Sequence, residues 1–290
     1  MILYFSGGTT SKLITEFMSA NNCARLFSYY NDKKVIESKV CEDVFLDCGA
    51  WTAFTKHKVI DLETYKQYLE EHKDTYKVAA SLDVIPHGDY KESAKLSYNN
   101  FIELRKYFGN SIQLLPTYHR GEPLEALIKL LTYEDEYGKL EYIGIGAVAS
   151  NKSRIVRDTF LQTVFNTIKK YRPDIKTHLF GLTDLSLLDK YPIYSADSTT
   201  WLMAGAMGEI ITDFGRIKIS DKNLSLNGFK AFNTQERESL ISYITKFGFT
   251  IEELQESSEK RQLFNVAYIK SKTDKIEWKN SKFIPKSKLF

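Results

Sequence analysis

The stretch Val44–Trp51, VFLDCGAW, contains the pattern that decides the fold. A short apolar run, Val44–Leu46, is followed at once by an aspartate and then by a turn of small residues. Short and nearly continuous apolar runs are typical of strands in a parallel sheet that helices cover. The stretch therefore predicts a buried strand whose carboxyl end is marked by Asp47.

The same pattern recurs along the first two-thirds of the chain. Seven further β-rich runs each precede a turn and a helical pattern: Ile2–Phe5, Arg25–Tyr29, Val78–Leu82, Ile112–Leu115, Tyr142–Ile145, Thr177–Phe180 and Ile193–Ala196. The amphipathic stretches between the runs predict helices: Leu62–His72 with Asp61 as its N-cap, Ser93–Phe108, Pro123–Leu131 and Arg154–Tyr171. Strands that alternate with helices indicate parallel βαβ units, and eight such strands close a TIM-like barrel.

We therefore expect an α/β protein with a (β/α)8 TIM-like barrel over residues 1–208. An open doubly wound sheet is the alternative, but no GxGxxG or GxxxxGK[ST] motif follows any strand, which disfavours a Rossmann domain or a P-loop enzyme. After residue 208 the rhythm changes, and residues 209–290 are expected to form an α+β extension packed on the barrel. Its expected elements are irregular strands in Glu209–Ser220 and Asn223–Phe232, and helices in Gln235–Phe247 and Ile251–Leu263.

Composition is that of an ordinary soluble protein, with 290 residues of which 43% are hydrophobic and 27% charged. Met1–Gly8 lacks the basic region of a signal peptide, and no apolar run approaches the roughly 20 residues of a membrane helix. We therefore expect a cytoplasmic protein without a membrane partner. The three cysteines, Cys23, Cys41 and Cys48, are too scattered for a disulfide framework or a cysteine-based metal site.

The net charge of +3 is too small to indicate a polyanionic partner by itself. Lys270–Lys288, however, contains seven lysines, with Trp278 and Phe283 between them. A basic stretch with aromatic residues can bind a phosphate backbone and stack on bases. The C-terminal extension therefore has two interpretations, a nucleic-acid contact or a solvated tail or final strand.

Polar residues gather directly after the apolar runs, where a parallel barrel has its active site. They are Asp47, Asp83, His119 with Arg120 and Glu122, Gly144, Gly146, Gly181 with Thr183, and Asp197 with Ser198. Each alone has a structural explanation, since an aspartate after a strand is commonly a helix N-cap. Three aspartates at one barrel mouth repel one another and raise at least one pKa, which indicates chemistry.

Two carboxylates that flank an anomeric carbon are what retaining glycosyl transfer requires. One attacks to form a glycosyl intermediate, and the other protonates the leaving group. The same logic holds when the leaving group is a nucleobase. Trp51 and Phe180 lie near two strand ends, where their rings could sandwich a planar heterocycle, although both could equally be core or rim aromatics.

Six segments resemble, in order, the active-site motifs of the tRNA-guanine transglycosylase superfamily. They are LDCGAW (Leu46–Trp51), SLDVIP (Ser81–Pro86), YHRGE (Tyr118–Glu122), YIGIGAV (Tyr142–Val148), HLFGLT (His178–Thr183) and YSADSTTW (Tyr194–Trp201). They are most similar to the phage and genomic-island DNA 7-deazaguanine transglycosylases of the DpdA type. The resemblance covers roughly residues 1–205.

The resemblance implies a role for each matching residue. Asp197 matches the nucleophile that attacks C1′ of the target guanosine, and Asp47 matches the general acid/base. Asp83 matches the carboxylate that hydrogen-bonds the guanine-like edge. Four residues match the remaining base-binding positions: Gly146 and Ala147, whose backbone reads the base and its 7-substituent, and Trp51 and Phe180, which stack on it.

Three departures from the family pattern bear on the substrate. Cys48 stands where the tRNA enzymes have a serine, and a thiol is a poorer hydrogen-bond partner. His119 stands near a family glutamine, in a setting closer to the DNA branch. No CxCxxC with a following histidine comes after Asp197, so we expect no structural zinc.

The resemblance thus implies a pentosyltransferase that exchanges guanine in DNA for a preQ0-like 7-deazaguanine, through a covalent glycosyl-aspartate and without a cofactor. Its partners would be DNA and the free base, in the host cytoplasm if the chain is phage-encoded. Three alternatives stay open: the same exchange on tRNA, a hydrolase that leaves an abasic site, and a non-catalytic nucleic-acid-binding barrel that serves as a partner subunit. The oligomeric state, a homodimer included, is left open.

Overall fold

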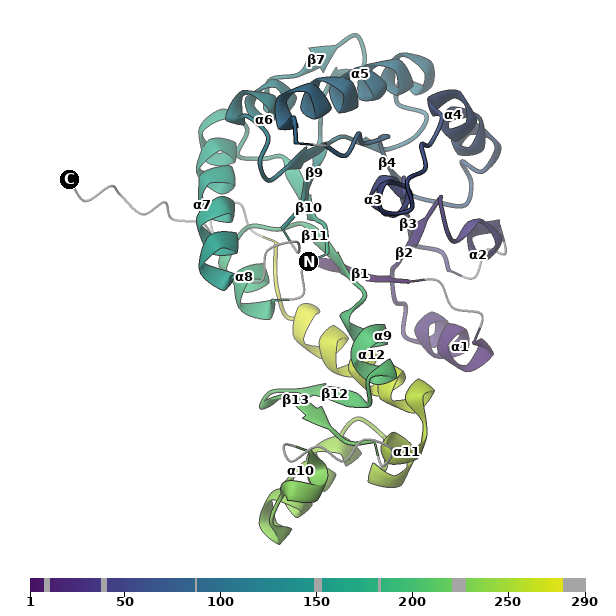
Figure 1. Cartoon of the computed structure of the whole chain (residues 1–290), viewed down its shortest axis with the longest axis vertical. Coiled ribbons are helices and arrows are strands. Elements are labelled where there is room, and N and C mark those ends of the chain that lie inside the picture. Colours follow the sequence, from purple (N-terminus) through teal and green to yellow (C-terminus); the bar gives the residue numbers. More distant parts are fainter. Residues whose placement is uncertain are drawn as a thin grey trace, which may run out of the picture. The chain divides into compact units, whose positions relative to one another are not determined.

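The computed structural model describes residues 1–7, 11–37, 41–86, 88–148, 153–181, 184–220 and 228–278. Within these ranges, nine short parallel strands form the main sheet (Figure 1). They are β1 (Ile2–Ser6), β2 (Arg25–Ser28), β3 (Val44–Asp47), β4 (Val78–Ala80), β5 (Leu114–Leu115), β6 (Thr117–His119), β9 (Tyr142–Gly146), β10 (Lys176–Leu179) and β11 (Ser195–Ser198). Their order is β5-β4-β3-β2-β1-β11-β10-β9-β6.

The sheet is a nearly closed parallel barrel. Its two outermost strands, β5 and β6, are separated along the chain by Pro116 alone. The N–H of Gly144 in β9 donates to the carbonyl oxygen of Pro116 at 2.9 Å, so the gap is bridged by a backbone hydrogen bond. An α/β fold of the TIM-like class is therefore confirmed, and an open doubly wound sheet is excluded.

Each of the eight predicted apolar runs overlaps one strand of this sheet. The ninth strand arises because proline has no N–H to donate and so interrupts the ladder between β5 and β6. The predicted strand Ile112–Leu115 is thus only part of the segment that completes the barrel; Thr117–His119 continues it and pairs with β9.

Helices of the barrel are α2 (Lys33–Glu37), α3 (Ala50–Thr55), α4 (Leu62–Glu71), α5 (Tyr90–Phe108), α6 (Leu124–Leu131), α7 (Arg154–Tyr171) and α8 (Leu185–Lys190). Figure 1 shows α3 to α8 arranged around the strands. A small hairpin, β7 (Glu134–Asp135) and β8 (Gly138–Lys139), joins α6 to β9. Asp61 caps α4 as predicted, since its carboxylate accepts from the N–H of Thr64 at 2.8 Å.

Aromatic and aliphatic side chains of alternating strand residues fill the barrel interior. Phe45 of β3 is fully buried and makes edge-to-face contacts with Tyr4, at 5.4 Å between ring centroids, and with Phe180, at 5.7 Å. Ala80, Leu115 and other buried residues complete this cluster. A filled interior leaves the carboxyl ends of the strands as the place for polar chemistry.

By their contacts the residues group into two compact units. One comprises Met1–Gly8, Ala24–Ser198 and Ile276–Phe290, and contains the barrel. The other comprises Thr9–Cys23 and Thr199–Lys275. This grouping by contacts does not test the predicted division into a core over 1–208 and an extension over 209–290. That division stays a prediction.

The second unit contains α1 (Lys12–Ala20), α9 (Thr200–Ala206), the hairpin β12 (Glu209–Thr212) and β13 (Gly215–Lys218), the short 3-10 helix η1 (Phe229–Ala231), α10 (Thr234–Thr245), α11 (Ile251–Glu256) and α12 (Ser258–Thr273). Asn265 of α12 is fully buried, and its side-chain amide contacts Ile211, Trp201 and Glu209. These hydrogen bonds fasten α12 to α9 and the hairpin.

Two predicted elements in this unit are wrong in detail. The helix expected over Ile251–Leu263 is two helices, because the Ser257 hydroxyl accepts from the N–H of Lys260 and starts α12 afresh. The strand expected near Phe232 is replaced by η1, whereas residues 223–227 of that prediction lie outside the described residues. Of the predicted basic stretch Lys270–Lys288, residues 279–288 also lie outside them.

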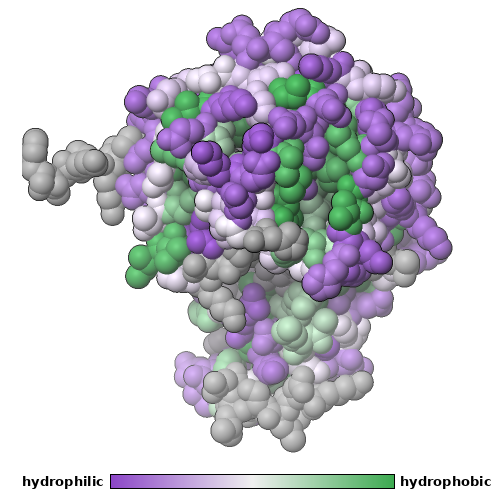
Figure 2. All heavy atoms as spheres, turned by 45° about the horizontal axis from the view of Figure 1, so that its top comes forward, coloured by the Kyte–Doolittle hydropathy of each residue, from purple (hydrophilic) through white to green (hydrophobic). Residues whose placement is uncertain are grey.

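No helix among the described residues is long and apolar enough to cross a membrane. On the face of the molecule shown in Figure 2, hydrophilic residues predominate and hydrophobic ones form small separate patches.

Candidate active site

Asp47 ends β3 at the mouth of the barrel. Its Oδ2 accepts a hydrogen bond from the N–H of Gly49 at 3.0 Å, and Gly49, not Asp47, is the N-cap of α3. Desolvation by the surrounding protein, followed by the charges of Asp197 and Asp83, raises the pKa of Asp47 to about 7. At neutral pH a large fraction of Asp47 is therefore protonated and able to act as an acid.

Asp197 lies in β11 and is 7% exposed. The Ser6 hydroxyl donates to its Oδ2 at 2.5 Å, and the N–H of Gly181 donates to its Oδ1 at 2.7 Å. His178 Nε2 lies 3.4 Å from the same Oδ1. Asp197 is not a helix N-cap either, since α9 begins after Thr199. These donors compensate a buried negative charge and fix the orientation of both oxygens.

A buried hydrogen-bond chain continues from Asp197 into the barrel. Burial lowers the pKa of His178, so its imidazole is neutral near pH 7. A carboxylate only accepts, so with Asp197 ionised the proton of His178 is on Nε2 and Nδ1 must accept from the Ser195 hydroxyl, at 2.6 Å. The Tyr142 hydroxyl then donates to Ser195. The chain Tyr142–Ser195–His178–Asp197 thus sets both the tautomer and the position of the imidazole.

Asp83 and His119 form a second charged group at the mouth. His119 Nε2 lies 3.3 Å from Asp83 Oδ2, and His119 Nδ1 lies 3.0 Å from Glu122 Oε1. Burial disfavours the charged imidazole, but the two carboxylates outweigh it and raise the pKa of His119 to about 10. Asp83 Oδ1 is buried and has no hydrogen-bond partner among the described residues. One acceptor oxygen is therefore left for a donor that this part of the chain does not supply.

Gly146 makes room for this imidazolium. A Cβ at Gly146 would lie 2.3 Å from His119 Cδ2, a distance that real Cβ atoms do not reach. The next residue, Ala147, has a left-handed backbone, with φ at 57°, which is uncommon for a residue with a side chain. This turn faces Arg120, whose N–H donates to the Gly146 carbonyl oxygen at 3.2 Å.

The other residues predicted to bind the base, Cys48, Trp51 and Phe180, differ in burial and in the residues they contact. Cys48 is buried beside Asp47, and burial followed by the charges of Asp47 and Asp83 raises the pKa of its thiol. Trp51 of α3 is 61% exposed and stacks on Phe54, with ring centroids 5.9 Å apart. Phe180 is half-buried and packs edge-on against His178. Their roles toward a base stay predictions, and Thr183 lies outside the described residues.

The structure thus brings Asp47, Asp83 and Asp197 close enough for their charges to interact. Sequence reasoning missed Ser6 and His178, which hold Asp197. The alternation of side chains along a strand does contain a signal for His178 and for its partner Ser195. His178 is two residues before Phe180, and Ser195 is two residues before Asp197, so each pair lies on one face of its strand.

Among the described residues, no group of three or more histidine, cysteine, aspartate or glutamate side chains is arranged to hold a metal ion. Cys23 and Cys48 are buried, and Cys41 is half-buried.

No known protein family matches the sequence, and no curated protein is similar enough to match it.

Proposed function

We propose that the protein is a transglycosylase that exchanges guanine in DNA for a 7-deazaguanine base, through a covalent bond between Asp197 and C1′. The observation that carries the proposal is the unlike setting of two neighbouring carboxyl groups. Asp47 has a pKa of about 7, whereas Asp197 accepts hydrogen bonds from Ser6 and Gly181. Pairs of carboxyl groups whose environments differ in this way divide the roles of acid and nucleophile between them.

In the first half-reaction, an Asp197 oxygen forms a bond to C1′ while the bond between C1′ and guanine N9 breaks. Asp47 supplies the proton that N9 of the departing guanine takes up. The target base has to be flipped out of its stack to reach the mouth, which costs a few kcal/mol. Ser6, Gly181 and His178 keep the attacking carboxylate in place without a large rearrangement.

In the second half-reaction, the incoming 7-deazaguanine gives its N9 proton to Asp47. Its N9 then attacks C1′, and the bond to Asp197 breaks. Both carboxyl groups return to their starting states, so the exchange needs no cofactor. Carbon at position 7 removes the N7 site whose protonation helps guanine to leave, and the exchange is therefore effectively one-way.

Asp83 supports the recognition of the base. Its unpartnered Oδ1 suits the N1–H and exocyclic amine of a guanine-like edge, while its Oδ2 is held by His119. His119 in turn is held by Glu122. An acceptor fixed in this way would reject an adenine-like edge, which presents an acceptor at the N1 position.

The test is incorporation of radiolabelled preQ0 by the purified chain into duplex DNA, single-stranded DNA and tRNA. Incorporation into DNA, with release of one guanine per base inserted, is the expected result. Preferential incorporation into tRNA would move the proposal to the rival polymer. Abasic sites formed without added base would indicate a hydrolase, and no incorporation by the chain alone would favour the non-catalytic partner barrel.

A further inference from the structure

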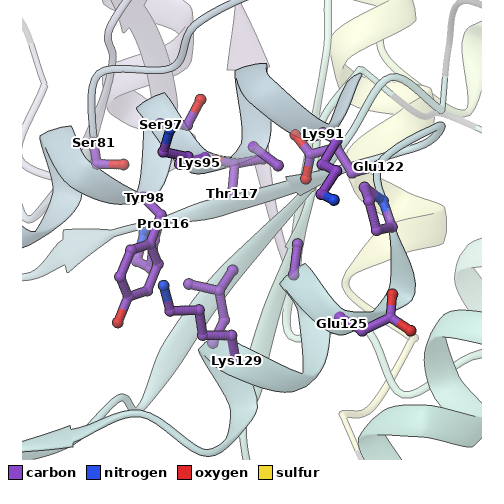
Figure 3. Close-up of a pocket in the computed structure, with 14 residues that line it drawn as sticks. Ser81, Lys91, Lys95, Ser97, Tyr98, Pro116, Thr117, Glu122, Glu125 and Lys129 are labelled. Carbon is purple, nitrogen blue, oxygen red and sulfur yellow. The ribbon is translucent and has the colours of Figure 1, made fainter. Parts of the chain in front are cut away.

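The buried chain Tyr142–Ser195–His178–Asp197 crosses three neighbouring strands of the barrel, β9, β10 and β11. Ser195 is in register with His178, and Asp197 lies two residues further along β11, on the same face of that strand. All four residues are buried. None of them lines the cavity of about 420 Å³ between α5 and α6 (Figure 3), so that cavity gives water no access to the chain.

A negative charge on Asp197 has no arginine or lysine partner among the described residues. Its one ion-pair contact there is with the imidazole of His178, whereas Asp83 has the imidazolium of His119. Asp47 lies close enough that the charges of the two carboxylates repel each other. Hydrogen-bond donors therefore have to decide which of these two carboxyl groups holds a proton.

The hydrogen atoms of the chain can run in two directions. In one, Tyr142 donates to Ser195, and Ser195 donates to His178 Nδ1. The Nε2–H of His178 then donates to an ionised Asp197. In the other direction, a protonated Asp197 donates to Nε2 and each following bond is reversed. The phenol hydrogen of Tyr142 would then need a new acceptor, yet Ser195 is its one hydrogen-bond partner in the part of the chain that the structure describes.

Tyr142 therefore favours the first direction. Burial raises the pKa of its phenol, so the hydrogen stays on the oxygen near pH 7. Reversal of the chain would leave a buried O–H without an acceptor, which costs free energy. The rings of Tyr4, Phe45 and Phe180 pack around the imidazole of His178 and supply no charge that would favour the opposite tautomer.

We propose that Tyr142, Ser195 and His178 are positioning residues that assign the charge within the carboxyl pair, so that Asp197 is ionised and the proton is on Asp47. In base exchange, the nucleophile and the acid would then be in the required states before the substrate binds. That consequence rests on the proposed function. The charge assignment itself is a property of the resting protein and is tested without a substrate.

NMR of the side-chain carboxyl carbons, in the full chain with isotope-labelled aspartate, tests the inference. Asp47→Asn and Asp197→Asn identify the two signals. At about pH 6, below the pKa of about 7 of Asp47, we expect an ionised Asp197 and a protonated Asp47 in the wild type. Ser195→Ala cuts the chain and Tyr142→Phe removes the donor at its end, so each should transfer part of the proton to Asp197. In base exchange, each should lower kcat roughly threefold to tenfold with KM unchanged.

Tyr4→Phe is the matched control, because this buried tyrosine also packs edge-on against His178 while its hydroxyl donates to Asp43. It should leave both carboxyl signals unchanged. In spectra of isotope-labelled histidine, His178 should carry its hydrogen on Nε2 in the wild type and in Tyr4→Phe, and partly on Nδ1 in Tyr142→Phe. A role in packing alone would not move the hydrogen between the two nitrogens.

A protonated Asp197 in the wild type would overturn the inference. So would carboxyl signals that are the same in the wild type and in Tyr142→Phe, the variant that loses a single oxygen, or equal changes in Tyr142→Phe and Tyr4→Phe. None of these results depends on base exchange. The expected signals in a wild type that exchanges no base would refute the proposed function and leave the charge assignment standing.

Discussion

Asp47 of β3 and Asp197 of β11 lie close enough in one barrel for their charges to interact, yet their immediate surroundings differ. Around Asp47 the structure places one backbone donor, Gly49, and the charges of two other aspartates, which together with burial raise its pKa to about 7. Around Asp197 it places a hydroxyl, a backbone N–H and an imidazole. The difference teaches that one residue type, in two strands of one barrel, can have its protonated form favoured at one position and both of its carboxylate oxygens held by hydrogen bonds at the other.

The largest effect should come from removing the attacking oxygen. Asp197→Asn keeps the shape of the side chain, so the fold should be retained while base exchange falls by about 10⁴-fold or more. Initial rates with saturating DNA and labelled base measure this. Asp174→Asn, at an exposed aspartate that pairs with Arg172, is the control and should exchange bases at the wild-type rate. Retained turnover in Asp197→Asn would show that Asp197 is not the nucleophile.

The second effect should come from removing the acid. Asp47→Asn cannot protonate the leaving base, and exchange should fall by about 10² to 10⁴-fold while DNA binding is kept. In the wild type, kcat/KM should decline as pH rises through about 7, because the acid must be protonated in the free enzyme. The pH profile of kcat/KM checks this. A rate that rose through the same range would assign Asp47 to the base role alone.

The free energy of unfolding should fall as pH rises, because the pKa of Asp47 is higher in the folded than in the unfolded state. Asp47 binds its proton more tightly in the folded state, where its pKa is about 7, than in the unfolded state, where it has the ordinary aspartate value of 3.8. Its contribution is therefore full below 3.8 and is lost as pH rises to about 7. His119 gives a second loss between 6.5 and about 10. Urea unfolding over this range should show the first loss vanish in Asp47→Asn and the second persist.

The smallest effect should come from the donors around Asp197. Ser6→Ala removes the 2.5 Å hydrogen bond to Oδ2 and should lower kcat about tenfold with little change in KM. Ser28→Ala is a matched control on the neighbouring strand, because the buried Ser28 hydroxyl has no hydrogen-bond partner in the part of the chain that the structure describes. Equal losses in the two variants would indicate a general packing effect and not a specific support of Asp197.

Much of the barrel could be predicted from the sequence, because alternation of apolar runs and amphipathic helices is a local signal. α7 has the bounds expected for it, and Asp61 caps α4. The break at Pro116 was not predicted, since which strand carries the closing gap depends on register between distant segments. The split at Ser257 was missed because the apolar period continues across it.

For the site, strand ends identified Asp47, Asp83, Asp197 and His119, because position in a parallel barrel follows from order along the chain. The sequence did not predict which side chains and backbone groups form hydrogen bonds with each of these residues. The expectation that a lone aspartate after a strand is a helix cap is wrong for both Asp47 and Asp197. The support of Asp197 by Ser6, which is 191 positions away, depends on pairing between β1 and β11.

The most direct test of the division of roles is the location of the covalent intermediate. The protein is mixed with a guanine-containing DNA oligonucleotide without free base, denatured rapidly, digested and analysed by mass spectrometry. The account predicts an adduct of the oligonucleotide lacking one guanine, on the peptide that contains Asp197 and absent from Asp197→Asn. An adduct on the peptide that contains Asp47, or exchange that persists in Asp197→Asn, would contradict it.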